Sequence, residues 1–148
     1  MYNFFQTIHV LAAVVWVGSA FFFNLIMGRL AAAEEMAAIG SITNQTPFVS
    51  KFFNVAAITT LVFGVAMVVE AEFLEFSDPF ISIGFLGILA SLGIGHGMIT
   101  PAATQLTAAI EAGDAAAAEE LGKKVGMLSA IDTVILFIVV WAMVVKPF

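Results

Sequence analysis

The sequence predicts an all-α integral-membrane protein, an antiparallel four-helix bundle, and three observations predict it. Of its 148 residues, 61% are hydrophobic and only 11% are charged. The mean hydropathy of +1.07 is far above that of soluble domains of this length. A membrane-spanning helix needs about 20 mostly apolar residues, and four stretches are long enough, at about residues 4–28, 52–73, 79–100 and 127–146. We therefore expect a single transmembrane domain over residues 1–148.

The first stretch is expected to remain in the protein as a helix. Its start, MYNFFQ, carries no Lys or Arg, and its apolar run is longer than that of a typical signal peptide. The loop before the third stretch, EFLEFSD, is so short that the second and third spans should form an antiparallel hairpin. Pro79 falls near the start of the third span and Pro101 just past its end, where a proline disrupts a helix least.

The other two connections are predicted to be largely helical. Residues 31–42 and 102–124 are rich in alanine with spaced acidic residues, a composition that suits helical extensions or interfacial helices.

The few basic residues predict the orientation of the chain in the membrane. They are Arg29, Lys51, Lys123, Lys124 and Lys146. Because Lys and Arg are retained on the cytoplasmic side, the loops at 29–51 and 101–126 are expected to be cytoplasmic, with both termini outside. Lys146, at the opposite end, is the one residue that favours the inverted topology, although a lysine there can also snorkel to the interface.

Charge and cysteine content exclude several classes of function. The net charge is −6, carried mainly by three acidic patches, which argues against nucleic acid or anionic substrates as partners. The chain has no cysteine, so a disulfide, a thiolate metal site and a cysteine nucleophile are excluded. The expected partners are the lipid bilayer and, beyond it, a redox partner or further copies of the chain.

Two helix faces carry distinctive residues, because neighbours on a helix recur every three to four positions. On the first span the polar members share a stripe that consists of His9, Ala13, Trp16, Ala20, Phe23, Asn24 and Met27. On the third span the stripe is made of small residues, namely Gly84, Gly87, Ser91 and Gly95. Small residues allow helices to approach closely, which is their commoner use in membranes, but they can equally make room for a flat cofactor.

Ionisable residues deep in a span are functional candidates, because each costs several kcal/mol in hydrocarbon unless it finds a partner or water. Three qualify here: His9, His96 and Asp132. At about 1.5 Å of rise per residue, His9 lies near the outer end, where Glu70 could pair with it. His96 and Asp132 both lie near the cytoplasmic end, and we expect Asp132 within hydrogen-bonding or water-bridged reach of His96.

The two histidines should not share one metal. Their depths differ by roughly 15–20 Å at a rise of about 1.5 Å per residue, whereas two imidazoles on one iron need nitrogens about 4 Å apart, at typical metal–nitrogen distances near 2 Å. For each histidine, the alternative to ligation is a packed and hydrogen-bonded residue of the core.

The run IHVLAAVVWVGSAFFFNLIMGRL resembles the first helix of a group of small membrane proteins that includes HemJ-type protoporphyrinogen oxidases and CopD-type copper-resistance proteins. In that helix a histidine is followed seven residues later by tryptophan, then by glycine and aromatic residues. The stretches AAITTLVFGVAMV and GILASLGIGHGMI resemble the second and third helices of the group, and IDTVILFIVVWAMVVKPF is similar to the HemJ-type ending. The resemblance covers most of the chain.

The resemblance implies a membrane bundle that holds haem b, with His9 as an axial ligand, and a bacterial plasma-membrane location. Met67 or Glu70 would supply the sixth ligand or orient His9, and Trp16 is either a wall of the pocket or an ordinary packing residue. Oxidases of this group have a lysine early in the third helix and an Asn-Glu pair opening the fourth. Here Gly84 and Phe85 take the lysine positions and the fourth helix has SAID, which puts protoporphyrinogen oxidation in doubt.

Two other classes of function remain open. The first is copper handling or solute conduction, because the sequence places several thioether side chains near His96 and Asp132, a soft ligand set suited to Cu(I). These are Met27, Met98, Met127 and Met36. Methionine is also a flexible apolar filler. The second is a non-catalytic accessory subunit of a larger membrane complex. Whether the chain is a haem-dependent oxidoreductase, a carrier or such a subunit is left open by the sequence.

Overall fold

The computed structural model describes residues 1–146, and its regular structure over that range is helical. The elements are α1 (Tyr2–Ala32), α2 (Met36–Thr43), α3 (Thr46–Glu70), α4 (Pro79–Ile94), the π-helix η1 (Gly95–Ile99), α5 (Thr100–Glu111) and α6 (Ala115–Val145). Because α4, η1 and α5 are continuous, four helices are long and apolar enough to cross a membrane, as predicted. Pro147 and Phe148 of the HemJ-like ending lie outside the described residues.

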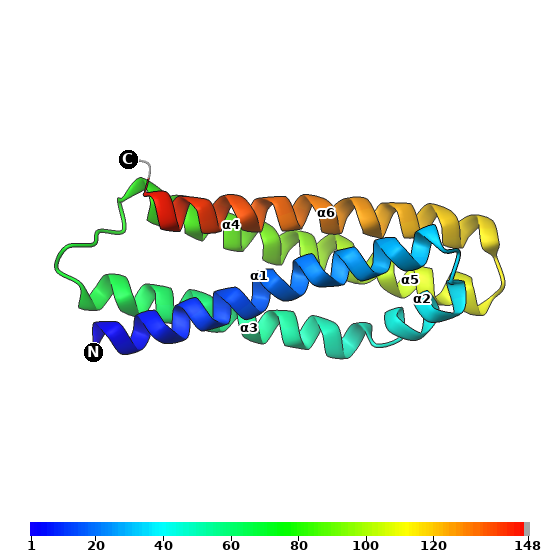
Figure 1. Ribbon diagram of the computed structural model, residues 1–148, viewed down its shortest axis with the longest axis horizontal. Helices are drawn as coiled ribbons and strands as arrows, with labels where there is room; N and C mark the ends of the chain where they lie inside the picture. Colours follow the sequence, from blue (N-terminus) through cyan, green and yellow to red (C-terminus); the bar gives the residue numbers. More distant parts are fainter. Residues whose placement is uncertain (147–148) are drawn as a thin grey trace.

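The long helices lie side by side along the long axis of the molecule (Figure 1). One end, here called the terminal end, carries the N-terminus, the loop at 71–78 and the last turn of α6. The other, the turn end, carries the turns at 33–35 and 112–114. Helix α1 packs mainly on α3, and α6 packs on α4 and α5, whereas α3 and α4 touch little. The second and third spans, although joined by a short loop, therefore pack mainly on other helices.

The third span continues past the point where the sequence predicted its end. Pro101 has no N–H to donate, and a proline ring collides with the carbonyl four residues earlier in a regular α-helix. The chain avoids the collision with a π-turn, in which the Thr100 N–H donates to the carbonyl of Gly95, five residues earlier. The prediction that the helix ends at residue 100 is wrong, because a wider turn accommodates the proline without ending the helix. Such π-turns are frequent at functional sites.

The predicted helical connections are present at the turn end. The Asp114 side chain caps α6 by accepting from the Ala117 N–H at 3.0 Å. Gly113, with a φ of 71°, provides the left-handed residue that ends α5. The alanine-rich stretch after Asp114 therefore joins the fourth span as one long helix, which begins well before residue 127.

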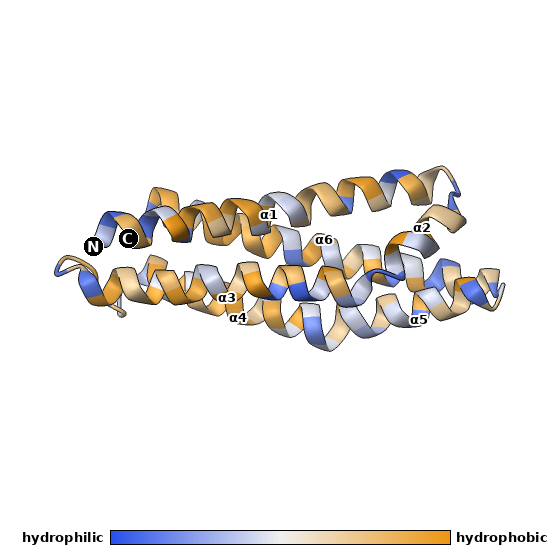
Figure 2. Cartoon of the chain, turned by 90° about the horizontal axis from the view of Figure 1, so that it is seen from below, coloured by the Kyte–Doolittle hydropathy of each residue, from blue (hydrophilic) through white to orange (hydrophobic). Residues whose placement is uncertain are grey.

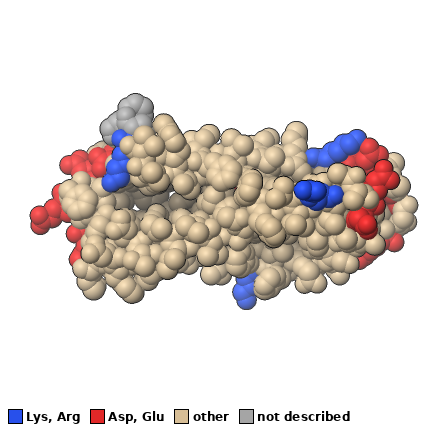
Figure 3. Space-filling model, viewed as in Figure 1, with Lys and Arg blue, Asp and Glu red and all other residues tan. Residues whose placement is uncertain are grey.

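The core is divided into three clusters along the long axis. The middle cluster is built from Trp16, Ala56, Ala57, Ile88 and Leu136. A second, at the turn end, contains Ile39, Leu106 and Ala118, and a third, at the terminal end, contains Val68, Phe80 and Ile81. Apolar residues also cover much of the outside of the helices (Figure 2). On the face in Figure 3 the acidic side chains gather at the two ends and leave the middle free of them, the pattern expected of a bilayer-spanning protein.

The small residues of α4 serve close packing against α6. A Cβ added to Gly87 would lie 2.1 Å from Cγ2 of Val139, and one added to Gly84 would lie 2.0 Å from Cε of Met143. The space beside both glycines is thus filled by side chains of α6. This arrangement agrees with the packing use of the stripe, since it leaves no open slot there for a flat cofactor.

Replacing Gly87 with alanine is expected to destabilise the bundle by about 1–3 kcal/mol, because Val139 is branched at Cβ and cannot swing its methyl group away freely. Gly93→Ala is the matched control, since a Cβ there meets nothing within 4 Å. Unfolding in detergent, followed by circular dichroism, measures both. Equal stability of the two variants would contradict the close α4–α6 packing.

Candidate functional site

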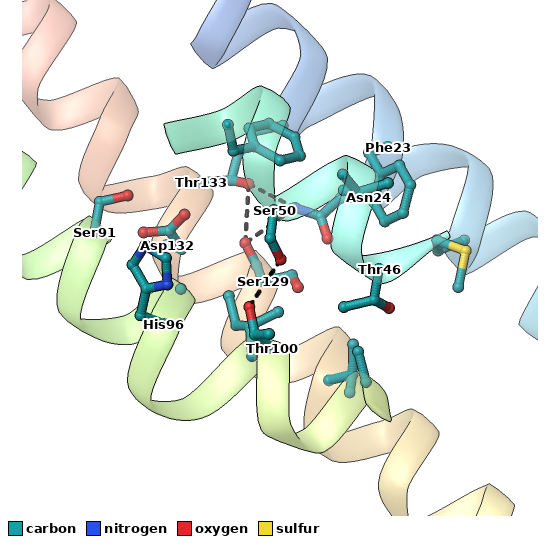
Figure 4. A pocket seen from close by; sticks show the side chains of 18 of the residues that line it. Phe23, Asn24, Thr46, Ser50, Ser91, His96, Thr100, Ser129, Asp132 and Thr133 are labelled. Carbon is teal, nitrogen blue, oxygen red and sulfur yellow. Dashed lines mark hydrogen bonds between the residues drawn. The ribbon is translucent and has the colours of Figure 1, made fainter. Parts of the chain in front are cut away.

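Among the cavities between the described helices, two lie on opposite sides of the middle cluster. The larger, of about 130 Å³, is on the turn-end side and is called the His96 cavity; it is lined from α1, α2, α3, α4, η1, α5 and α6 (Figure 4). The smaller, of about 70 Å³, is on the terminal side and is called the His9 cavity; it is lined from α1, α3, α4, α6 and the 71–78 loop. The two histidines thus belong to separate sites, in keeping with the depth difference predicted from the sequence.

The imidazole of His9 is held in one orientation by α3. Its Nδ1 lies 2.7 Å from the backbone carbonyl oxygen of Thr60. A carbonyl oxygen only accepts, so Nδ1 carries the proton and donates it, and in the neutral ring Nε2 keeps a free lone pair. Gly64 makes room for the ring, because a Cβ at this position would lie 3.0 Å from Cε1 and 3.1 Å from Nδ1 of His9. Metal-binding histidines have this arrangement, with one nitrogen on a carbonyl and the other available.

The partner predicted for His9 is a different residue in the structure. Glu70 does not line the His9 cavity; its Oε1 lies 3.4 Å from the N-terminal amine of Met1, at the exposed end of α3. The carbonyl of Thr60 takes the acceptor role that the sequence assigned to Glu70. Met67, the other sixth-ligand candidate, does line the cavity, together with Met143.

His96 and Asp132 line the same cavity, as expected, but the structure shows no direct hydrogen bond between them. The His96 Nε2 lies 2.6 Å from Oδ1 of Asn54 on α3. The Oδ1 atom of Asp132 is buried and has no hydrogen-bond partner among residues 1–146. Figure 4 shows the Asp132 carboxylate facing the bundle interior next to Ser91 and His96. The predicted inward direction of Asp132 is therefore confirmed, whereas the nearer polar partner of His96 is an amide on another helix.

Hydroxyl and amide groups connect the helices around this cavity. Asn24 Nδ2 donates to the Ser129 carbonyl at 3.0 Å and to Thr133 Oγ1 at 2.6 Å, which ties α1 to α6. The hydroxyls of Ser50 and Thr100 lie 3.1 Å apart, between α3 and α5. Asn24, singled out from the sequence, is thus part of a satisfied polar network that fixes the register of the helices.

Trp16 and the methionines lie elsewhere than the sequence suggested. Trp16 lines the His96 cavity and belongs to the middle cluster, so it is not a wall of the His9 cavity. Of the methionines expected around His96, only Met27 lines that cavity. The remaining three, Met36, Met98 and Met127, are exposed. The thioether groups of the turn end therefore do not form a ligand set with His96.

Several residues that shape the two sites were not found from the sequence. Asn54 and Ser50 stand four residues apart on α3, and Thr60 and Gly64 repeat that spacing further along the same helix. Polar or small residues four apart in an apolar helix are the signal that could have identified each pair, because residues four apart share a face.

The His9 cavity supplies one nitrogen donor for a haem but little open space. A volume of about 70 Å³ holds a few water-sized groups, and the slot beside Gly84 is filled by the flexible end of Met143. Rotation of Met143 away from Gly84 would enlarge the cavity along α4. Phe80 lines this cavity, and the Nζ of Lys146 lies 5.1 Å from the centre of the Phe80 ring. The donor chemistry therefore fits a haem, whereas the volume of about 70 Å³ means that the helices around the cavity would have to separate to admit one.

A metal held by several protein ligands finds less support. Within the described part of the chain, no three His, Cys, Asp or Glu side chains come together as a metal site.

Comparison of the chain with family models, curated proteins and solved structures finds no match.

Proposed function

We propose that this chain is an integral-membrane protein that binds haem b through His9 and serves electron transfer or the oxidation of a membrane-dissolved substrate. The observation that carries the proposal is the hydrogen bond from His9 Nδ1 to the Thr60 carbonyl, because it leaves Nε2 as a free and oriented ligand. The HemJ-like first helix supports the same assignment for His9. When bound, haem supplies one-electron redox chemistry that the side chains of the protein do not have.

The residues of the protein would hold the group in distinct ways. Met67 lines the same cavity and would be the second protein ligand, since His with Met is an established ligand pair for haem. The apolar lining would keep water away from the group, and the Thr60 carbonyl would hold the His9 ring in the tautomer that can ligate a metal. Titration of the apoprotein in detergent with haemin tests the proposal: a saturable Soret band supports it, and a spectrum equal to that of haemin in detergent alone contradicts it.

The second candidate function is the handling of copper, and one observation favours it. His9, Met67 and Met143 line a single cavity, and imidazole with two thioethers is a soft ligand set suited to Cu(I). We therefore consider copper at the terminal end rather than around His96. Under this alternative, Cu(I) binding would depend on all three side chains and haemin would not saturate a site.

We further propose that the four long helices span a bacterial plasma membrane as an antiparallel bundle, with the loops at 29–51 and 101–126 cytoplasmic and both termini outside. The distribution of Lys and Arg supports this orientation. Single cysteines introduced as Ser77→Cys and Ala115→Cys should react with an impermeant maleimide from opposite sides of the membrane, Ser77→Cys from outside. Labelling of both from the same side would contradict the topology.

A further inference from the structure

The His96 cavity has the chemistry of a site for a neutral or weakly polar ring rather than for an anion. Its lining contains one carboxylate, that of Asp132, and no Lys or Arg, so a negatively charged ligand would have no counter-charge there. Three aromatic side chains line it beside the polar groups, namely Trp16, Phe23 and Phe53. Flat faces of this kind favour an aromatic ligand, which can stack against them in offset or edge-to-face geometry.

One acceptor on the polar side of the cavity lacks a donor. The Oδ1 atom of Asp132 is buried with no hydrogen-bond partner among the described residues, and a buried acceptor without a donor costs free energy. The hydroxyl of Ser91 is the donor nearest the carboxylate, yet Oδ1 stays without a partner. Both N–H groups of the Asn24 amide are already taken, by Ser129 and Thr133. A ligand hydroxyl beside Asp132 would satisfy the orphaned oxygen.

The cavity reaches the outside of the bundle between α3 and η1. The His96 side chain lines the cavity yet is exposed, and its bond to Asn54 joins η1 to α3 where the two neighbouring helices α3 and α4 touch little. The surface on both sides of this bond is apolar, with Val55, Ile58 and Met98 exposed. A molecule that enters here would come from the lipid and not from water.

We propose that the His96 cavity binds the hydroxylated ring of a lipid-soluble quinol, with its hydroxyl on Asp132, its ring among the three aromatic side chains and the His96–Asn54 bond at its lateral opening. A quinol would be the membrane-dissolved substrate of the proposed function. The role of the quinol as a substrate therefore rests on that function. Binding itself does not need haem, so it can be measured on the apoprotein.

The fluorescence of Trp16 provides the assay. In the Trp141→Phe variant, Trp16 is the only tryptophan and reports binding in the cavity. In the Trp16→Phe variant, the exposed Trp141 is the only tryptophan and reports the change in emission that comes from partitioning of the probe into the micelle. Duroquinol, kept reduced under argon, is titrated into both proteins. Saturable change of Trp16 emission and only linear change of Trp141 emission are expected. Linear and equal changes in the two proteins would overturn the proposal.

Variants of Asp132 distinguish a ligand site from a structural role. Asp132→Leu removes the acceptor and should weaken the binding of duroquinol by about tenfold or more, while Asp132→Asn keeps an oxygen acceptor and should retain it. Duroquinone, which has no hydroxyl to donate, should bind about tenfold more weakly than duroquinol. If Asp132→Leu bound duroquinol as tightly as the wild type, and duroquinone bound as tightly as duroquinol, the cavity would hold only water or lipid. The His9→Ala variant separates this inference from the proposed function. It should bind duroquinol like the wild type even if the protein does not bind haemin.

Discussion

Replacement of His9 with alanine is expected to reduce the haem content of the purified protein by about tenfold or more, because the only imidazole of the His9 cavity is then lost. His96→Ala is the matched control: it removes a histidine from the other cavity and should leave haem content unchanged. Pyridine haemochrome analysis gives the haem per chain, and circular dichroism verifies that both variants remain helical. If His9→Ala kept its haem while His96→Ala lost it, the ligand assignment would be wrong and the site would belong at the turn end.

Enlargement of Gly64 should have nearly as large an effect, although His9 itself stays in place. An added Cβ would lie 3.0 Å from Cε1 of His9, so Gly64→Ala should crowd the imidazole and Gly64→Leu should push it off the Thr60 carbonyl. Loss of an orienting partner of a metal-binding histidine typically costs about 10–100-fold in affinity. We therefore expect the dissociation constant of haemin to rise in two steps. In Gly64→Leu it should rise by about 10–100-fold, and in Gly64→Ala it should rise by less.

Gly18→Ala is the control for this series, because a Cβ at Gly18 meets nothing within 4 Å. Its haemin affinity should equal that of the wild type. Wild-type affinity in Gly64→Leu as well would mean that the position of the His9 ring against α3 has no part in binding.

The four long helices were predictable from the sequence because hydropathy over about 20 residues is a strong signal. The ends of these helices were harder to predict. The helix at 79–111 passes through Pro101 by a π-turn, and no local pattern distinguishes a proline that ends a helix from one that widens it. The early start of α6 follows from the Asp114 cap and the alanines after it, which sequence reasoning treated as a possible extension only.

The ionisable residues of the two cavities were predictable from the sequence, but the residues that pair with them were not. Depth arithmetic correctly separated His9 from His96, because helical rise fixes position along the axis. Helical rise does not fix the rotation of each helix about its axis, and this rotation decides which side chains pair. His9 therefore hydrogen-bonds to Thr60 instead of Glu70. His96 hydrogen-bonds to Asn54 instead of Asp132. Trp16 shares a stripe with His9, yet the length of two helical turns between them places it in the other cavity.

The dithionite-reduced absorption spectrum of the wild-type protein, purified from haem-replete cells, tests the assignment of haem b most directly. The expected result is a Soret band with sharp α and β bands, at about one haem per chain, that is lost in His9→Ala and retained in His96→Ala. A colourless wild-type protein, or bands that persist unchanged in His9→Ala, would contradict it.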